Sequence, residues 1–323
     1  MTELKEFNVT FRGDEANQLF FEPVFRGNGI FSGSYRFLTD VRTKRKLTFV
    51  GEMERIVRKY AGCGFNPVGS LEVYDRWIEV NKMKADVSQC WDEFKDTVFE
   101  ELMNRGVRFP DLTDTLMGEI LMTQTQSAIS KDVERLAYFG DESSLNPDTD
   151  PINGFWSVLY PEMVADGLIP RANIASGSAI PAGDGLAAIK AVYEQADLRL
   201  RALPNNLKAI YVTGSVYEAY ESDLISLGAG TPYLIDTTQN GTAGLSYKGI
   251  RVIPMWFWDL NLAANQHRIE YRANGNNVIA TDSTNPESQI AMWYEMKDET
   301  LNIKSRFTLG AQIIHPSLVS LGY

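Results

Sequence analysis

Residues 112–139, which follow Pro110, show an apolar pattern of helical period. Leucine, isoleucine and valine recur there at intervals of three and four residues, and Gly140 supplies a stop signal. At 1.5 Å per residue the helix would be roughly 40 Å long, beyond the usual length of a globular helix. The polar run 123–127 interrupts the apolar stripe, so a sustained coiled coil is not indicated. We therefore expect one long helix that crosses a flat domain.

A second strong pattern lies near the C-terminus. Apolar and polar residues alternate from Leu301 to Ile313, which is typical of a half-buried strand. The apolar segment "IAMWYEM" and the turn "KDET" come just before it. The sequence therefore predicts an antiparallel hairpin over residues 290–314.

Residues 155–289 show a mixed pattern between these two elements. A helix is predicted to begin at Asp184, which we expect to cap it, and to end before Pro204. The strand "LKAIYVT" is followed by a second helix, for which Ser215 and Glu218 have the spacing of a capping box. "GIRVIPMWFW" and "NNVIATD" are predicted to be further short strands, with "PMWFW" as core strand. The range reads as a compact α/β domain.

The N-terminal third has a looser pattern. Residues 1–30 hold scattered aromatics, among them Phe20 and Phe21, with no sustained period, which indicates an extended arm. Residues 35–50 form a short strand pattern. Residues 71–87 are extended with apolar residues on both faces, which suits a strand that touches something on each side. The two stretches either pair as a long hairpin or form a loop.

Charge is spread unevenly along the chain. The net charge is −11, yet residues 1–65 hold 11 Lys and Arg against 8 Asp and Glu, and the rest holds 20 against 34. This balance argues against broad binding to a phosphate backbone. The cluster within residues 42–46 is suited either to nucleic acid or to an acidic protein surface, and the overall charge favours the protein surface.

One glycine motif invites a nucleotide-binding interpretation. Gly183, Gly185 and Ala188 have the spacing of a dinucleotide fingerprint. Such a fingerprint needs a strand directly before it and an acidic residue about twenty positions later. Pro181 interrupts the approach and positions 201–207 hold no Asp or Glu, so we expect these glycines to shape a helix start.

No other catalytic or metal-binding motif is complete. His267 and His315 have no partner at ligand spacing, and Cys63 and Cys90 form no C-x-x-C pair. A Cys–His pair formed only in the fold stays open. P-loop, calcium-loop and nucleophile-elbow patterns are missing, and no run of eighteen apolar residues indicates a membrane span. We expect no catalytic residue, cofactor, metal site or membrane contact.

The order of arm, extended loop, long helix, α/β domain and returning hairpin resembles the Hong Kong 97-type major capsid proteins of tailed bacteriophages. The local matches are Phe139-Gly140-Asp141 with Gly154-Phe155, then "LKAIYVTGSVYEAYESDL" leading through "YKGIRVIPM", and finally "NNVIATD" and "IAMWYEMKDETLNIKSRFTLGAQIIHP". The resemblance covers nearly the whole chain in organisation, although each motif is loose.

This resemblance implies an α+β, Hong Kong 97-like capsid fold. Residues 1–30 would be the N-terminal arm and residues 31–95 the extended E-loop. The peripheral domain would combine residues 96–154, with a spine helix, and residues 290–323. The axial domain, around the hexamer or pentamer axis, would be residues 155–289.

The resemblance also implies a structural function. The chain would self-assemble into hexamers and pentamers of an icosahedral head shell, in the virion, after assembly in the host cytoplasm. The shell would enclose double-stranded DNA without sequence-specific binding. Because the arm begins close to Met1, we expect a separate scaffolding protein, with portal and head-completion proteins as further partners.

The arm and the loop would have to cover their aromatic residues on neighbouring subunits. A basic loop tip would meet the acidic body of an adjacent copy, which aids orientation more than affinity. The expected contact residues are Arg42, Lys44, Arg45, Lys46, Trp77, Phe20 and Phe21. An encapsulin-like nanocompartment shell is the closest alternative, and an α/β enzyme is a more distant one.

Overall fold

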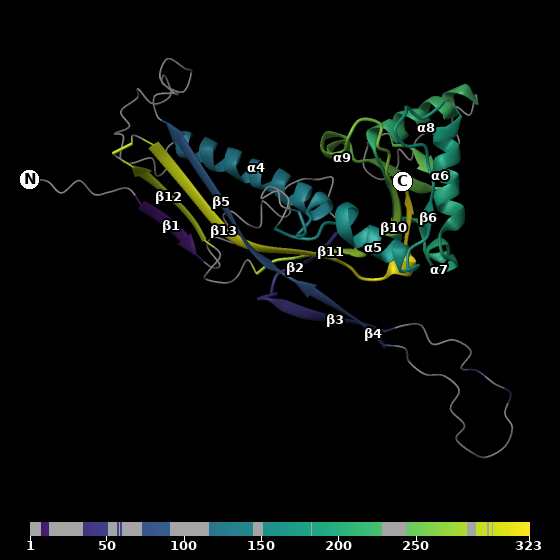
Figure 1. Cartoon of the computed structure of the whole chain (residues 1–323), viewed down its shortest axis with the longest axis horizontal. Coiled ribbons are helices and arrows are strands. Elements are labelled where there is room, and N and C mark those ends of the chain that lie inside the picture. The colour runs from purple at the N-terminus through teal and green to yellow at the C-terminus, as the bar shows by residue number, and fades with distance from the viewer. Residues whose placement is uncertain are drawn as a thin grey trace, which may run out of the picture.

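The computed structural model describes residues 8–12, 35–50, 57, 59, 73–90, 116–144, 151–181, 183–227, 244–282, 289–295, 297–298 and 300–323. These residues form an elongated region and a compact α/β unit, which lie at opposite ends of the view in Figure 1. A two-stranded hairpin projects from the place where the two meet. No helix among the described residues is long and apolar enough to cross a bilayer.

The elongated region is built on a six-stranded sheet with the order β1-β12-β13-β11-β2, in which β5 also pairs with β13. Its strands are β1 (Asn8–Arg12), β2 (Tyr35–Leu38), β5 (Asn81–Cys90), β11 (Asn277–Ala280), β12 (Gln289–Glu295) and β13 (Thr300–Ile313). β13 pairs with β12 in its first half, with β11 at its end and with β5 along most of its length. The predicted hairpin is confirmed, with Gln289 opposite Arg306.

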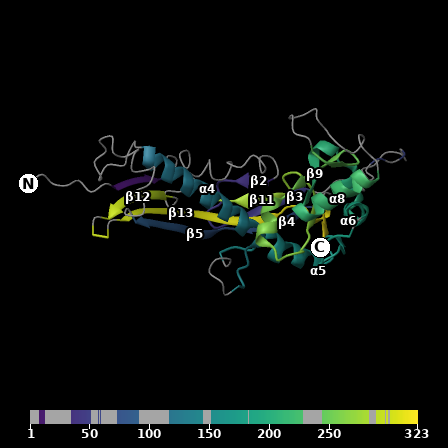
Figure 2. The same ribbon diagram turned by 90° about the horizontal axis from the view of Figure 1, so that it is seen from above.

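Helix α4 (Leu116–Phe139) lies along this sheet in Figures 1 and 2. The helix ends at Phe139 as predicted; residues 111–115 lie outside the described part of the chain. Gly140 follows because the backbone needs the space: a Cβ there would lie 2.3 Å from the carbonyl oxygen of Ile152. The Gly154 amide donates to the Gly140 carbonyl oxygen at 2.8 Å, so the chain turns back against the end of the helix.

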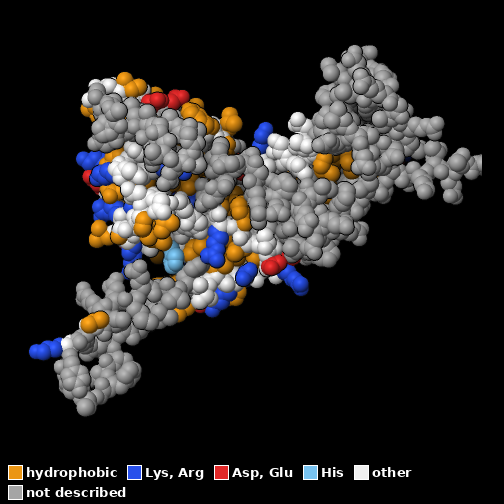
Figure 3. All heavy atoms as spheres, turned by 180° about the vertical axis from the view of Figure 1, so that it is seen from behind, with side chains coloured by type: hydrophobic (Ala, Val, Ile, Leu, Met, Phe, Trp, Pro, Cys, Tyr) orange, Lys and Arg blue, Asp and Glu red, His pale blue; other side chains and the backbone are white. Residues whose placement is uncertain are grey.

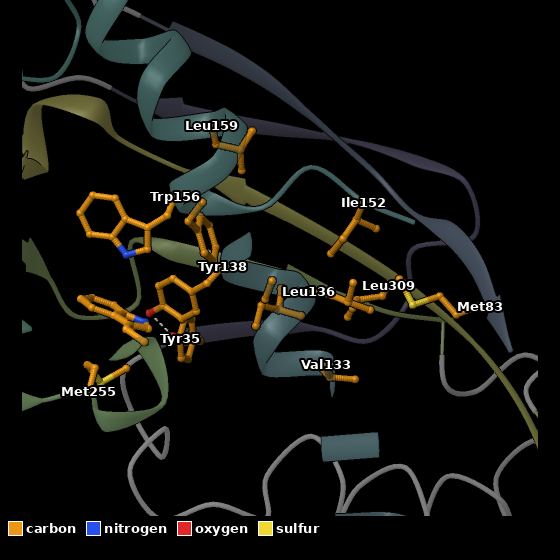
Figure 4. Close-up of a cluster of buried hydrophobic side chains, with 14 of the residues drawn as sticks. Tyr35, Met83, Val133, Leu136, Tyr138, Ile152, Trp156, Leu159, Met255 and Leu309 are labelled. Atoms are coloured by element: carbon orange, nitrogen blue, oxygen red, sulfur yellow. Dashed lines mark hydrogen bonds between the residues drawn. The ribbon is translucent and has the colours of Figure 1, made fainter. Parts of the chain in front are cut away.

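The end of α4 carries the centre of the main hydrophobic core (Figure 4). The Tyr138 ring lies 5.4 Å from Phe155, on the π-helical turn η3 (Phe155–Leu159), and 5.1 Å from Trp258, measured between centroids. Trp258 belongs to α9 (Trp256–Asn261) of the α/β unit. The Tyr138 hydroxyl is hydrogen-bonded to that of Tyr35 on β2. Edge-on aromatic contacts of this kind join both parts of the molecule in one core.

The α/β unit contains a sheet with the order β6-β14-β10-β7-β9-β8. Its strands are β6 (Arg171–Ala172), β7 (Lys208–Val212), β8 (Ser246–Tyr247), β9 (Ile250–Pro254), β10 (Ile269–Ala273) and β14 (Val319–Gly322). Its other elements are α5 (Tyr160–Ala165), α6 (Asp184–Gln195), α7 (Leu198–Ala202), η4 (Asn205–Leu207), α8 (Gly214–Ser226) and η5 (Pro316–Leu318). All five residues of β7 and of β10 are buried, as expected of central strands covered on both faces.

The two glycines of the nucleotide-like motif have structural roles. Gly183 has φ of 92°, in the left-handed region that glycine adopts at low cost. A Cβ at Gly185 would lie 2.6 Å from the backbone of Ala219 and Tyr220, so α6 and α8 pack more closely than a side chain would allow. These glycines therefore shape the helix start and its contact with α8.

Both predicted helix caps are wrong. The start of α6 is capped by Asp223 of α8, whose carboxylate accepts from the amides of Gly183 and Leu186 at 2.6 and 2.9 Å. Asp184 is already the first helical residue. At α8 the N-cap is Thr213, without a side-chain cap, and the Ser215 hydroxyl turns instead to a histidine ring. In both cases a partner distant in sequence replaced the local bond.

Strand pairing departs from the predicted ranges at two points. β11 falls within residues 155–289 but pairs with β13 and β2 of the elongated sheet. β14 falls within residues 290–323 but pairs with β10 of the α/β unit. The prediction of "PMWFW" as strand is also wrong after Pro254, because α9 begins at Trp256 and buries Trp258.

A buried ion pair lies at the junction of the two regions. Glu270 and Arg272 on β10 are both fully buried, with 2.5 Å between Arg272 Nε and Glu270 Oε1. Glu270 also accepts from the Tyr160 hydroxyl and from Asn277 Nδ2 of β11. Burial alone would lower the pKa of Arg272, but the Glu270 carboxylate and nearby tyrosines raise it well above its usual value. The Arg272 guanidinium therefore stays charged, and the bond from Asn277 to Glu270 links β10 to β11.

Candidate inter-subunit surface

Two extended stretches before the long helix form a hairpin. This is one of the two arrangements that the sequence left open. β3 (Lys44–Val50) runs antiparallel to β4 (Val73–Glu79). Lys44 lies opposite Glu79, and Lys46 lies opposite Trp77. Because side chains alternate along a strand, the hairpin has two distinct faces.

One face anchors the hairpin to the body. Ile78 is fully buried in a small cluster with Val41, Val278 and Ile314, and Leu47 packs against it. Arg76 is half-buried, donates to the sulfur of Met163 at 3.7 Å, and has its pKa lowered by burial. Near the base, the side-chain amide of Gln312 donates to the Trp77 carbonyl oxygen at 2.9 Å. The anchoring contacts come from β11, β13 and α5.

The other face is open to solvent and centres on Trp77, whose exposed fraction is 50%. Lys44 Nζ lies 5.3 Å from the centroid of its ring and also pairs with Glu79. Lys46 Nζ lies 2.6 Å from the Asp75 carboxylate, which also accepts from Thr48 Oγ1 at 2.9 Å. The bonds from Lys46 and then Thr48 lower the pKa of Asp75. An aromatic ring framed by self-paired charges is a surface suited to burial against another molecule.

The structure brings five of the predicted contact residues together. Arg42, Lys44, Arg45, Lys46 and Trp77 all lie in or next to the hairpin, exposed or half-exposed. Phe20 and Phe21 lie outside the described residues.

The expectation that the cluster forms a loop tip is wrong, because residues 42–46 lie at the base of the hairpin, where the Val80 amide donates to the Thr43 carbonyl. Lys44 and Lys46 are paired with acids of β4, which leaves Arg42 and Arg45 as the cations of the cluster without an ion pair among the described residues.

Sequence reasoning missed further exposed apolar side chains. Val73 and Tyr74 are each 52% exposed at the far end of the hairpin. A second group lies on α8 and α9, where Trp256 is exposed beside the ring of Tyr217. Ile225 and Leu260 are also exposed on these helices. The residues on α8 and α9 belong to short apolar runs that read as core, so their exposure is evident only from the fold.

The side chains nearest to a catalytic arrangement serve a structural purpose. Ser215 Oγ lies 2.7 Å from His267 Nδ1, and His267 Nε2 lies 2.9 Å from the Ser178 carbonyl oxygen. A carbonyl only accepts, so Nε2 carries a proton. His267 is 2% exposed, and the pair ties the Ser178 loop to α8. No group of three metal-ligating side chains occurs among the described residues.

The fold is shared with shell proteins of known structure. A chain from the satellite phage P4 procapsid including size determination (Sid) protein aligns with a TM-score of 0.60 and 11% identity, over 99% of this chain and 93% of that chain. The capsid of the empty GTA particle gives 0.54 and 12%, over 91% and 90%. The SrpI encapsulin of Synechococcus elongatus PCC 7942 gives 0.53 and 10%, over 89% and 84%.

No protein-family model matches the sequence, and no curated protein matches it significantly. The likeness therefore rests on structure alone. The predicted capsid-type α+β fold is confirmed, whereas the N-terminal arm, the E-loop and the domain ranges stay predictions.

Proposed function

We propose that this chain is the major capsid protein of a tailed bacteriophage, which self-assembles into the hexamers and pentamers of an icosahedral head. The observation that carries the proposal is the fold match to a phage procapsid over 99% of the chain. A shell built from one repeated fold needs no active site in each subunit. In this proposal the chain is a structural protein and not an enzyme.

The hairpin supplies a physical reason for assembly. Apolar side chains on its open face and far end, Trp77, Val73 and Tyr74, are each about half exposed. Covering apolar surface gains roughly 25 cal/mol per Å², so a neighbouring subunit that covers these residues stabilises the contact. The same gain repeats around a closed shell. The hairpin is thus our candidate for the E-loop, with Phe20 and Phe21 as proposed contacts of the arm.

The two arginines at the hairpin base, which have no ion pair among the described residues, would orient neighbouring subunits. Arg42 and Arg45 are exposed on a chain of net charge −11, so an adjacent copy presents mainly acidic surface to them. Lys44 and Lys46 are committed to Glu79 and Asp75 and would hold the hairpin in shape. Scaffolding, portal and head-completion proteins are further proposed partners, and the virion, assembled in the host cytoplasm, is the proposed location.

A nanocompartment shell is the second candidate, because the SrpI encapsulin has the same fold at a TM-score of 0.53. The two candidates differ in contents. Head shells would protect double-stranded DNA from nuclease, and nanocompartments would enclose a cargo protein.

The test is negative-stain microscopy of the full-length chain expressed in bacteria, followed by nuclease treatment of the particles and analysis of their contents. Without a scaffolding protein, we expect the chain to assemble into capsomers or closed shells. The variant Arg42→Gln/Arg45→Gln should form them more slowly than Lys44→Gln/Lys46→Gln, a matched double neutralisation. A chain that stays a compact monomer in solution, without particles, would contradict the proposal.

A further inference from the structure

A basic edge of the α/β unit stands out on this acidic chain. Arg201, at the end of α7, and Lys248, between β8 and β9, both lie against the ring of Tyr193 on α6. The Arg201 guanidinium carbon is 5.9 Å from the ring centroid, and Lys248 Nζ is 4.4 Å from it. Figure 3 shows several Lys and Arg side chains on the outer side of the α/β unit.

The backbone presents Lys248 at some cost. Lys248 has φ of 51° and Gly249 has φ of 77°, the signs required by a two-residue turn between β8 and β9. Asn, Asp and Gly favour such positions, whereas lysine does not. Asn205 Nδ2 donates to the Lys248 carbonyl oxygen at 3.2 Å and holds the turn. The strained residue places its ammonium group over Tyr193, and 5.5 Å from the Tyr247 centroid.

Two hydrogen-bond donors at this edge have no acceptor among the described residues. One is the hydroxyl of Tyr271, a fully buried residue whose ring lies 5.8 Å from Tyr193, and the other is Arg201 Nε. Burial raises the pKa of Tyr271, so its hydroxyl keeps its proton. A buried donor without an acceptor costs about 1–3 kcal/mol. Both donor atoms are themselves buried, so they add to the positive character beneath the Tyr193 ring without contacting a ligand directly.

The neighbouring acids are already engaged. Glu194 lies 3.8 Å from Lys190, and the Asp197 carboxylate accepts from the Arg199 amide at 2.7 Å at the start of α7. Lys208 Nζ donates to the Arg201 carbonyl oxygen at 2.7 Å and adds positive charge behind the site. The edge therefore has a local positive potential that the net charge of −11 conceals.

We propose that Arg201, Lys248 and Tyr193 form a contact site for the phosphate backbone of double-stranded DNA. In nucleic acids, the phosphate groups are the part that an arginine guanidinium and a lysine ammonium group bind. Because both cations lie against the Tyr193 ring, that ring is not free to stack on a base, so the contact is independent of sequence. The choice of DNA over an acidic protein rests on the proposed shell function.

The test is the salt dependence of binding of a fluorescein-labelled DNA duplex to the full-length chain, followed by fluorescence anisotropy. Lys248→Asn places a residue that the turn favours, so the variant should fold as well as the parent. Lys248→Asn and Arg201→Gln should each reduce the log–log salt slope by about 0.9, the loss of one phosphate contact, equally for duplexes of different sequence.

The controls make the same charge change next to the site. Arg199→Gln on α7 and Arg251→Gln on β9 remove exposed cations that do not contact Tyr193 and should leave the slope nearly unchanged. Equal losses in controls and site variants, or no binding of the parent chain, would overturn the site. The site would also be overturned if the chain bound polyglutamate in preference to the duplex. The same holds if inorganic phosphate displaced the duplex completely at constant ionic strength.

Microscopy separates the two proposals. Normal DNA-filled particles together with an unchanged salt slope in Lys248→Asn overturn the site but keep the proposed shell. Absence of particles counts against the shell itself.

Discussion

The α/β unit and the β3–β4 hairpin bury their apolar residues in opposite ways. In the unit, α6 and α8 pack against the sheet, and Trp258 of α9 is fully buried. In the hairpin, Ile78 is fully buried but the adjacent Trp77 is 50% exposed. The sheet of the unit is covered on both faces within its own subunit, although α8 and α9 leave Trp256, Ile225 and Leu260 exposed, whereas the hairpin is covered on one face only. We therefore expect stability and assembly to depend on different residues of one chain.

The sharpest test of this comparison substitutes one tryptophan in each region. Trp258→Ala should lower the free energy of unfolding by about 3–5 kcal/mol, because it empties a packed site. Trp77→Ala should change it by less than about 0.5 kcal/mol, as for a surface residue, yet should reduce particle formation. Urea denaturation and negative-stain microscopy give the two measurements. Equal destabilisation by both variants would end the distinction.

The joint between the regions should be nearly as sensitive. Arg272→Met leaves the Glu270 carboxylate buried without its cation, which should cost about 3–5 kcal/mol of unfolding free energy. The double variant Glu270→Leu/Arg272→Met removes both charges and should recover most of the loss. Chemical denaturation of the two variants measures the difference. A double variant as unstable as the single one would show that the charges themselves are needed.

A smaller effect is expected where two helices meet inside the α/β unit. Gly185→Ala forces a methyl group against the backbone of α8 and should cost about 1–3 kcal/mol. Gly183→Asn is the matched control, because asparagine tolerates a left-handed backbone and a Cβ there meets nothing within 4 Å. The midpoint of thermal unfolding should fall for Gly185→Ala and stay unchanged for Gly183→Asn. A comparable loss in the control would place the strain in the turn and not in the helix contact.

The smallest effect is expected on the open face of the hairpin, as a function of pH. In the folded chain the pKa of Asp75 lies below its ordinary value of 3.8. The contribution of its carboxylate to the stability of the hairpin is therefore fully present above pH 3.8 and is lost as the pH falls through the folded pKa. We expect the Trp77 indole NMR signal to shift in that acidic range while the rest of the fold persists. Asp75→Asn should remove the shift, and an unchanged titration in that variant would assign it to another group.

Elements with a local signature were predictable from the sequence. The end of α4 at Phe139 and the β12–β13 hairpin follow from apolar periods and from turn residues beside them. The Asp223 cap of α6 was not predictable, because its carboxylate comes from another helix. The pairing of Lys44 with Glu79 was equally hidden, since it depends on the register of β3 with β4. The basic cluster was correctly found, but its place at the hairpin base was not.

The elongated sheet also sets the order in which the chain can fold. β1, β2 and β5, from the N-terminal third, pair with β12, β11 and β13, from the last fifth. Such non-local pairing slows folding, because a long loop must close before any contact forms. During synthesis on the ribosome, β1, β2 and β5 therefore have no pairing partner until the last fifth of the chain has been made. The α/β unit also takes β10 and β14 from that final segment, so before it is made only β7, β9 and β8 of that sheet can pair.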